Sequence, residues 1–334
     1  MNLTSSREVH LITRPRGMPR ASDFIVATSP VAPLQAGEVR VRNCFLSVDP
    51  YMRGRMNEGP SYTPPFELGK PMDGGAVGEV VESKAPEFKP GDAVLSRFGW
   101  REVFNAVPAD LHRVSRDVAP LSLFLGALGM TGLTAWVGLR LSEAKAGETV
   151  YVSGAAGAVG HVAGQLAKLR GCRVMGSAGS SEKVLFLRDT CGFDVAFDYT
   201  VGPVVEQLRV EAPDGIDVYF DNVGGATLAA ALTSLRIHGR IVACGSISGY
   251  NDEQPAPGPT NLFNIITKRL TMKGLIVSDW LDLEDEFRTE VGGLLRSGAM
   301  KSKETVVDGI DQAVDAFLGL FTGHNVGKMI VRLS

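Results

Sequence analysis

The sequence predicts a two-domain α/β protein, in which a parallel, doubly wound sheet is joined to a smaller β-rich domain. From about residue 128 onward, short strand-like segments alternate with helical patterns. Before that residue, short strand-like segments are separated by glycine and proline turns. The chain of 334 residues is long enough for two domains with sizeable cores.

The second half of the chain contains the alternating pattern. Its expected strands are 149–153, 173–177, 195–198, 216–221, 240–244 and 272–277. Helical patterns fall between them, for example at 181–190 and 226–237. Strands that alternate with helices pair in parallel through right-handed crossovers. We therefore expect one six-stranded parallel sheet that binds a ligand at the carboxyl ends of its strands.

The remaining segments predict the β-rich domain. Its expected strands include 39–42, 76–81 and 93–95. After residue 299 the alternation weakens to a strand at 305–307, a helix at 310–321 and a last strand at 329–331. The predicted domains are therefore residues 1–127, residues 128–299, and a return to the first domain over 300–334. An inserted domain of this kind would place the active site in the cleft between the two.

Composition and charge favour an ordinary cytoplasmic globular protein. The chain is 44% apolar and 21% charged, and its net charge of −3 gives no electrostatic indication of nucleic-acid binding. The first seven residues lack the apolar core of a secretory signal. Residues 118–139 carry no charge, but their glycines and one proline favour a buried connection over a membrane span. The four cysteines are scattered, which is typical of reduced thiols.

The most informative segment is 148–170. A strand at its start turns on Gly154, Gly157 and Gly160 into a helical pattern. Backbone N–H groups at the positive end of such a helix hold the pyrophosphate of a dinucleotide. The spacing is G-x-x-G-x-x-G instead of the more usual G-x-G-x-x-G, but small residues still stand where backbone must approach phosphate. We therefore predict a nicotinamide cofactor and hydride transfer.

The end of the second strand indicates which cofactor is bound. NAD sites usually place Asp or Glu there, about 20 residues after the glycines, to bind the ribose 2′-OH. This chain has hydroxyl side chains from Ser177 to Ser181, followed by Glu182 and Lys183. Glu182 can serve the helix dipole, and Lys183 would bind a 2′-phosphate. The alternative for Lys183 is an ordinary solvated helix residue, and we predict NADP(H).

The residues after two later strands, and the lack of a metal-ligand pattern, limit the reactions that the site could catalyse. Asn222 and the segment 244–250 follow two of the expected strands, where such sheets bind ligands. The five histidines lie far apart and lack the paired spacing of a zinc site. We expect no metal, so hydrogen bonds and the cofactor itself must polarise the substrate.

These features resemble the medium-chain dehydrogenase/reductase superfamily, and within it the zinc-independent leukotriene B4 dehydrogenase, prostaglandin reductase and alkenal double-bond reductase branch. The motifs that carry the resemblance are 46–53, 129–136, the glycine turn, 220–225, 274–277 and 325–328. Where zinc-dependent relatives have Gly-His-Glu, this chain has Gly69-Lys70-Pro71-Met72-Asp73-Gly74-Gly75.

The resemblance implies a Rossmann NADP-binding domain, a GroES-like substrate domain, and a homodimer that reduces the C=C bond of α,β-unsaturated ketones and aldehydes with NADPH. It assigns the pyrophosphate to Gly157, Ala158, Val159 and Gly160, and the 2′-phosphate to Lys183 and Tyr199. It assigns the nicotinamide half to Met130, Thr131, Asn222, Cys244, Gly245, Ser246, Ile247, Ser248, Tyr250, Leu275, Ile276, Val277 and Asn325.

One position departs from the family pattern. Several members have a tyrosine, a proposed proton donor, where this chain has Thr267. A threonine hydroxyl cannot replace a phenol as an acid. Tyr51, Tyr250, the cofactor ribose or water must then protonate the product, unless Tyr51 only forms a pocket wall. Quinone reduction and a non-catalytic NADPH-binding protein are the alternative functions.

Overall fold

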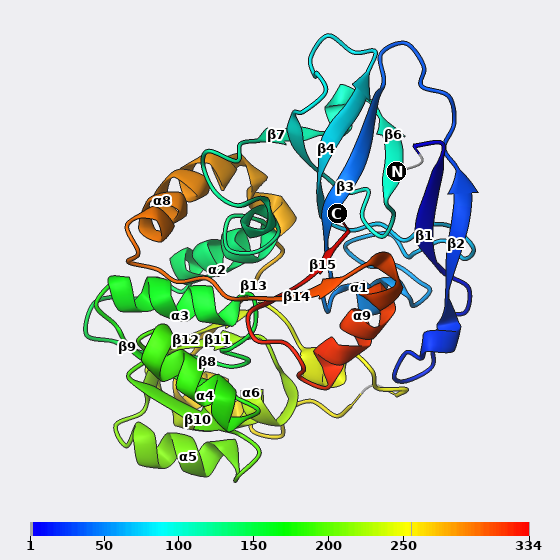
Figure 1. The fold of residues 1–334 in the computed structure, drawn as a ribbon. Coiled ribbons are helices and arrows are strands. Elements are labelled where there is room, and N and C mark those ends of the chain that lie inside the picture. The colour runs from blue at the N-terminus through cyan, green and yellow to red at the C-terminus, as the bar shows by residue number, and fades with distance from the viewer. Residues whose placement is uncertain (1–2, 255, 334) are drawn as a thin grey trace. The chain divides into compact units, whose positions relative to one another are not determined.

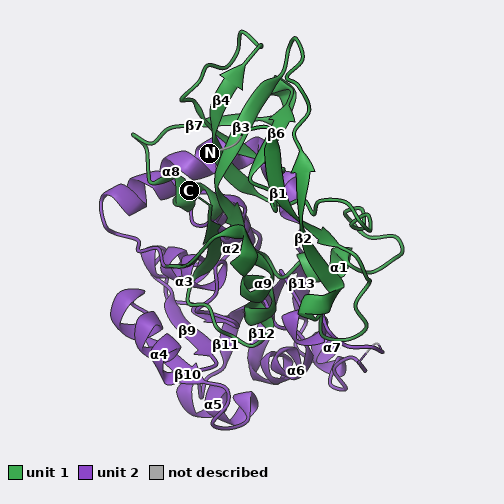
Figure 2. Cartoon of the chain, turned by 45° about the vertical axis from the view of Figure 1, so that its right-hand side comes forward, with its two compact units in different colours: residues 1–125, 304–334 green, residues 126–303 purple. Residues whose placement is uncertain are grey.

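The computed structural model describes residues 3–254 and 256–333 (Figure 1). It divides into two compact units (Figure 2). Unit 1 comprises residues 1–125 and 304–334, and unit 2 comprises residues 126–303. Unit 2 is therefore a continuous insertion into unit 1, with boundaries that differ by two and four residues from those expected at 127 and 299.

Unit 2 is built on one parallel sheet of six strands, as predicted. The strands are β8 (Thr149–Val152), β9 (Arg173–Ala178), β10 (Val195–Asp198), β11 (Ile216–Asp221), β12 (Leu235–Ala243) and β13 (Thr271–Gly274). They lie in the order β10-β9-β8-β11-β12-β13. The chain thus extends the sheet in one direction from β8 and then in the other from β11. Parallel sheets bind ligands at the carboxyl ends of the strands on either side of such a reversal.

Seven α-helices accompany this sheet in the described part of unit 2. They are α2 (Met130–Leu141), α3 (Gly160–Leu169), α4 (Ser181–Leu185), α5 (Val204–Glu211), α6 (Gly225–Ser234), α7 (Phe263–Thr267) and α8 (Glu284–Arg296). The helix predicted over 226–237 ends at Ser234, because Leu235 already pairs with Ile216 as the start of β12. The strand predicted over 272–277 ends at Gly274 and is followed by a short 3-10 helix over Val277–Leu283.

Unit 1 is β-rich and includes the C-terminal segment. Its strands are β1 (Ser5–Leu11), β2 (Phe24–Pro30), β3 (Val39–Ser47), β4 (Ala76–Ser83), β5 (Ala93–Ser96), β6 (Val103–Ala106), β7 (His112–Val114), β14 (Glu304–Asp308) and β15 (Lys328–Arg332). A seven-stranded sheet contains β14-β15-β3-β4-β5-β7, and β6 also pairs with β3. The antiparallel pairing of β15 with β3 joins residues almost 300 positions apart in the chain.

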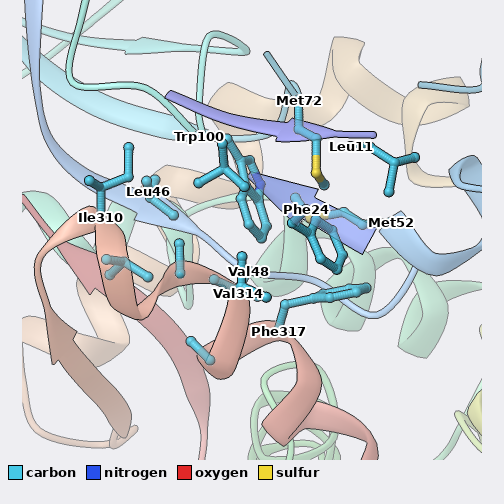
Figure 3. Close-up of a cluster of buried hydrophobic side chains, with 14 of the residues drawn as sticks. Leu11, Phe24, Leu46, Val48, Met52, Met72, Trp100, Ile310, Val314 and Phe317 are labelled. Atoms are coloured by element: carbon cyan, nitrogen blue, oxygen red, sulfur yellow. The ribbon is translucent and has the colours of Figure 1, made fainter. Parts of the chain in front are cut away.

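The core of unit 1 packs helix α9 (Ala313–Phe321) against the strands and against helix α1 (Met52–Arg55), as Figure 3 shows. The ring of Phe317 meets those of Trp100 and Phe24 edge-on, at centroid distances of 6.1 and 6.2 Å. Met52 belongs to the same buried cluster. The core therefore fixes the segment that carries Tyr51, the residue before α1.

The long uncharged segment does not form one continuous helix. It contains a 3-10 helix at Leu121–Leu125 and then most of α2. In the part of the chain that the structure describes, no helix is both long enough and apolar enough to cross a membrane.

Candidate functional site

The glycine turn lies between β8 and α3, beside the point where the strand order of the sheet reverses. Gly154 has φ +56°, a conformation that side chains disfavour. A Cβ atom at Gly160 would lie 2.5 Å from the carbonyl oxygen of Gly154 and 2.7 Å from Cα of Ala155. Gly154 therefore allows the turn to form, and Gly160 allows α3 to approach it closely.

The start of α3 presents backbone N–H groups. Among the backbone hydrogen bonds of residues 3–254 and 256–333, none has the N–H group of Val159 or Gly160 as its donor. No side chain caps the helix, which begins at Gly160 after Val159. N–H groups that lack an acceptor at a helix N-terminus fit the pyrophosphate of a dinucleotide. The consecutive residues Gly157, Ala158, Val159 and Gly160 form this turn, and their contact with a pyrophosphate stays a prediction.

A buried histidine stiffens this turn, and sequence reasoning had assigned it no role. Nδ1 of His161 lies 2.7 Å from the carbonyl oxygen of Gly157, so the neutral ring donates its Nδ1 proton there. Burial lowers the pKa of His161 and keeps the ring neutral. Nε2 is buried and makes no hydrogen bond within the described residues. The side chain is therefore a support for the Gly157 carbonyl.

The two residues expected at a 2′-phosphate follow neighbouring strands, with Lys183 after β9 and Tyr199 directly after β10. The N–H of Tyr199 donates to the carbonyl oxygen of Ala178 at 3.0 Å, which places Tyr199 beside the end of β9. A Cβ atom at Gly179 would lie only 2.6 Å from the Tyr199 hydroxyl. Ser180 caps α4 by accepting the N–H of Lys183. Partial burial lowers the pKa of the Lys183 ammonium, and the charge of Glu182 opposes this shift.

Asp221, at the end of β11, fixes the turn on the other side of the point where the strand order reverses. Its Oδ1 atom accepts hydrogen bonds from the Tyr219 hydroxyl at 2.7 Å and from the N–H groups of Val223 and Gly224 at 2.9 and 2.8 Å. The side chain is 2% exposed, and burial raises the pKa of its carboxyl group although these bonds oppose the shift. The sequence motif contained Asp221. Its role as a hub, in which one carboxylate oxygen accepts three hydrogen bonds, could not be predicted without the fold.

Asn222 is fixed by the neighbouring strand. Its side-chain amide donates to the carbonyl oxygen of Ser153 at 2.7 Å, and its N–H donates to the Ser153 hydroxyl at 3.1 Å. Ser153 directly follows β8. The predicted ligand residue Asn222 is therefore anchored across the reversal of strand order, next to the glycine turn.

The loop 244–250 is anchored to the backbone of the same residue, Asp221. The N–H groups of Cys244 and Gly245 donate to the Asp221 carbonyl oxygen at 2.9 and 3.0 Å. Ile247 and Ser248 bond in turn to the backbone oxygens of residues 222 and 223. Burial and the charge of Asp221 raise the pKa of the Cys244 thiol to about 12. The loop is thus rigidly placed, with a thiol that stays protonated.

Tyr250 closes this loop. Its hydroxyl oxygen accepts the N–H of Ser246 at 3.3 Å, and the ring is half-buried. Burial raises the pKa of Tyr250 above its ordinary value. The phenol therefore remains protonated at neutral pH and can donate a hydrogen bond.

The other residues predicted at the nicotinamide half occupy varied positions. Met130 begins α2 and is 40% exposed, whereas the Thr131 hydroxyl donates to the Gly126 carbonyl oxygen at 3.0 Å. Leu275, Ile276 and Val277 follow β13 in unit 2, and Leu275 is bonded to Ala243. Asn325 lies in unit 1 and donates its amide to the Gly327 carbonyl oxygen at 2.8 Å. Their contacts with a cofactor remain predictions.

Thr267, which replaces the family tyrosine, is the last residue of α7. It is exposed, and its hydroxyl donates back to the Phe263 carbonyl oxygen at 3.4 Å. A hydroxyl engaged with its own helix gives no sign of a role in proton transfer.

Tyr51 belongs to unit 1, in a tight turn that precedes α1. The N–H of Met52 donates to the Asp49 carbonyl oxygen at 3.2 Å, and Pro50 occupies the second position of this turn. Tyr51 itself packs partly buried against the core cluster. Burial, and after it the charge of Asp49, raise the pKa of Tyr51 well above that of a free phenol. Tyr51 is thus a fixed and protonated hydroxyl donor.

A cationic side chain stands next to this phenol. Arg55 is one helical turn after Tyr51, and its guanidinium binds both carboxylate oxygens of Asp73, with Nη2 3.0 Å from Oδ2. The same guanidinium stacks on Phe66 at 4.1 Å from the ring centroid. The positive charge of Arg55 opposes the rise in the Tyr51 pKa.

Among the described residues, no group of three or more His, Cys, Asp or Glu side chains is arranged to hold a metal ion.

Comparison with known proteins decides the family. Residues 7–114 match the family described as N-terminal domain of oxidoreductase, and residues 158–293 match the one described as zinc-binding dehydrogenase. The chain is 42% identical over 338 residues to an NADP(+)-dependent 2-alkenal reductase of Nicotiana tabacum, covering 99% of this chain and 98% of that one. The chain belongs to the medium-chain dehydrogenase/reductase family. It falls in the branch of the alkenal, curcumin and prostaglandin reductases.

Two further relatives align with nearly the whole length of this chain. An NADPH-dependent curcumin reductase of Escherichia coli is 39% identical and covers 97% of this chain and 96% of that one. The crystal structure of CurA from Vibrio vulnificus in complex with NADPH has a TM-score of 0.94 and 38% identity, over 98% of this chain and 99% of that chain. The family and fold expected from the sequence are confirmed.

Proposed function

We propose that this protein binds NADPH and reduces the C=C bond of α,β-unsaturated ketones and aldehydes, with hydride added at the β-carbon. The observation that carries the proposal is identity of about 40% along nearly the whole chain with proteins named 2-alkenal reductase and NADPH-dependent curcumin reductase. The N–H groups at the start of α3 fit the pyrophosphate of this cofactor, and Lys183 and Tyr199, which follow the neighbouring strands β9 and β10, fit its 2′-phosphate.

The chemistry divides between cofactor and chain. NADPH, when bound, supplies the hydride. The chain must hold the substrate, stabilise the negative charge that develops on its carbonyl oxygen, and allow a proton to reach the α-carbon. Tyr51 and Tyr250, each a protonated phenol, are the two alternative donors that we propose for this oxygen. Removing one such donor typically lowers kcat by about 10²- to 10³-fold.

Turnover with a panel of substrates tests this proposal. NADPH oxidation is followed by absorbance with enones, enals and simple quinones, and the products are identified. We expect saturated ketones and aldehydes. Turnover confined to quinones would replace the proposal with quinone reduction, and tight NADPH binding without any turnover would indicate a non-catalytic binding protein.

Replacement of Lys183 tests the choice of cofactor. Because a charge-assisted bond to phosphate contributes about 1.5–3 kcal/mol, Lys183→Ala should weaken NADPH binding by about 10- to 100-fold and NADH binding much less. Lys303→Ala, at an exposed lysine of the same unit, is the matched control and should change neither affinity. Fluorescence titration of all three proteins with both cofactors gives the result. Equal losses for NADPH and NADH in Lys183→Ala would contradict the phosphate contact.

We also propose that the protein forms a homodimer through the edge of the parallel sheet. In the described structure β13 pairs on one side only, with β12. Exposed apolar side chains lie on this strand and on the helix that precedes it in the chain: Met272 on β13 is 44% exposed, and Phe263 and Ile266 on α7 are each 69% exposed. An unpaired edge flanked by apolar surface is a template for pairing with a second copy across a twofold axis.

Sedimentation velocity tests the dimer. We expect a dimer for the natural chain and a shift toward monomer for Met272→Arg, since this change places a charge on the paired edge. Val210→Arg, at a side chain 71% exposed on α5, is the control and should leave the dimer intact. A natural chain that stays monomeric at micromolar concentration would refute the proposal.

A further inference from the structure

We propose that the buried ion pair between Asp49 and Lys328 is a positioning device for the phenol of Tyr51. The inference rests on the proposed function, in which Tyr51 donates to the substrate oxygen. It gives a role to two residues that the family motifs contain but that no step of the chemistry uses.

The pair is completely enclosed in unit 1. Lys328 is 1% exposed and Asp49 is 3% exposed. The ammonium nitrogen lies 3.1 Å from Oδ1 of Asp49, and it donates to the carbonyl oxygens of Val48 at 2.7 Å and Met329 at 2.9 Å. All three ammonium protons therefore have acceptors. The second carboxylate oxygen of Asp49 accepts the hydroxyl of Ser47.

The position of the pair links two distant segments of the chain. Strand β15 pairs antiparallel with β3, and Ile330 lies opposite Ser47. Continuing this register by two residues brings Lys328 opposite Asp49, just beyond the end of β3. Asp49 is also the first residue of the turn that contains Tyr51. The side chain of Lys328, on the C-terminal strand β15, thus contacts the turn that contains Tyr51.

Charges around Tyr51 explain why the partner of Asp49 must be a cation. The groups that act on the phenol are Asp49 and Asp73, which raise its pKa, and Arg55 and Arg97, which lower it. Asp73 is neutralised by Arg55, and Asp49 is neutralised by Lys328. Without Lys328, an uncompensated buried carboxylate would stand two residues from Tyr51. Its charge would raise the pKa of the Tyr51 phenol further and so weaken the phenol as a hydrogen-bond donor to the substrate oxygen.

One more carboxyl group faces Lys328. Glu304 helps to keep the ammonium charged, although burial lowers the pKa of Lys328. Burial also raises the pKa of Glu304 itself. Any titration seen after removal of Lys328 must therefore be assigned to Asp49 or Glu304 by a second substitution.

The first experiment compares Lys328→Met with Asp49→Asn/Lys328→Met in the full-length chain. Lys328→Met should lower kcat at least tenfold while NADPH affinity changes less than twofold. Its kcat should also fall as the pH rises from about 5 to about 8, because a buried unpaired carboxyl group has a raised pKa and inhibits once ionised. The natural chain should lack this dependence, and the double variant should lose it. Persistence of the dependence in the double variant would assign it to another group and overturn the proposal.

A double-mutant cycle with Tyr51→Phe separates positioning from structural support. If the pair acts through the phenol, Lys328→Met should lower kcat much less in the Tyr51→Phe background than in the natural chain. Equal fold-losses in both backgrounds would show that the pair only supports the fold. If Tyr51→Phe alone leaves kcat unchanged, the role of Tyr51 in the proposed function fails instead. Should Lys328→Met not fold, the charge-balanced double variant carries the same cycle.

Discussion

Replacing Gly160 by alanine should nearly abolish cofactor binding. The added Cβ would lie 2.5 Å from the Gly154 carbonyl oxygen and 2.7 Å from Cα of Ala155, both of them backbone atoms that must move. The N–H groups of the turn would then lose their common direction. Each charge-assisted bond to phosphate contributes about 1.5–3 kcal/mol, so the loss of two of them should weaken NADPH binding by about 100-fold or more.

The matched control for this change is Gly293→Ala. Gly293 also lies in a helix, α8, but a Cβ atom there meets nothing within 4 Å. Alanine at an open helical position stabilises by up to about 1 kcal/mol. Gly293→Ala should thus bind NADPH as tightly as the natural chain does. Calorimetric titration of both variants gives the comparison, and unchanged affinity in Gly160→Ala would show that the turn does not hold the pyrophosphate.

Truncation of Asp221 should give the second large effect, on both stability and catalysis. Asp221→Ala leaves the Tyr219 hydroxyl and the N–H groups of Val223 and Gly224 without their shared acceptor. Each buried unsatisfied donor costs about 1–3 kcal/mol, so we expect a loss of at least about 3 kcal/mol in the free energy of unfolding. The alanine variant keeps the Asp221 carbonyl oxygen that binds Cys244 and Gly245, but the turn at Val223 and Gly224 should loosen. Because Ser248 donates to the Val223 carbonyl oxygen, the loop 244–250 should loosen with this turn, which raises the KM for NADPH.

Asp282→Ala serves as the control for Asp221, because Asp282 lies exposed on the surface of the same unit. Surface substitutions of this kind usually change stability by less than about 0.5 kcal/mol. Urea unfolding and steady-state kinetics of the two variants should therefore differ sharply. A loss below about 1 kcal/mol in Asp221→Ala would mean that water replaces the carboxylate at little cost and that Asp221 is not a hub.

The strands of unit 2 were largely predictable, because their pattern is local. Strands β10 and β11 begin and end where the sequence predicted, since each is a short apolar run bounded by turn residues. The helix over 226–237 was predicted too long because the apolar spacing continues past Ser234 into β12. There, pairing of Leu235 with Ile216 overrides the helical pattern.

The candidate site was predictable only where it follows strand ends. The glycine turn and Asn222 could be placed because parallel sheets bind ligands at that edge. The ion pair of Asp49 with Lys328 could not, since it depends on β15 pairing with β3. The hub at Asp221 was equally hidden, because only the folded turn directs two N–H groups and a hydroxyl to one oxygen atom.

The measurement that tests the account most directly follows the transferred hydrogen. NADPH that carries deuterium at the transferred position of the nicotinamide is incubated with an α,β-unsaturated ketone, and the product is analysed by NMR and mass spectrometry. We predict a saturated ketone with an intact carbonyl group, one deuterium at the β-carbon and a solvent proton at the α-carbon. An unsaturated alcohol with deuterium on the former carbonyl carbon would contradict the account.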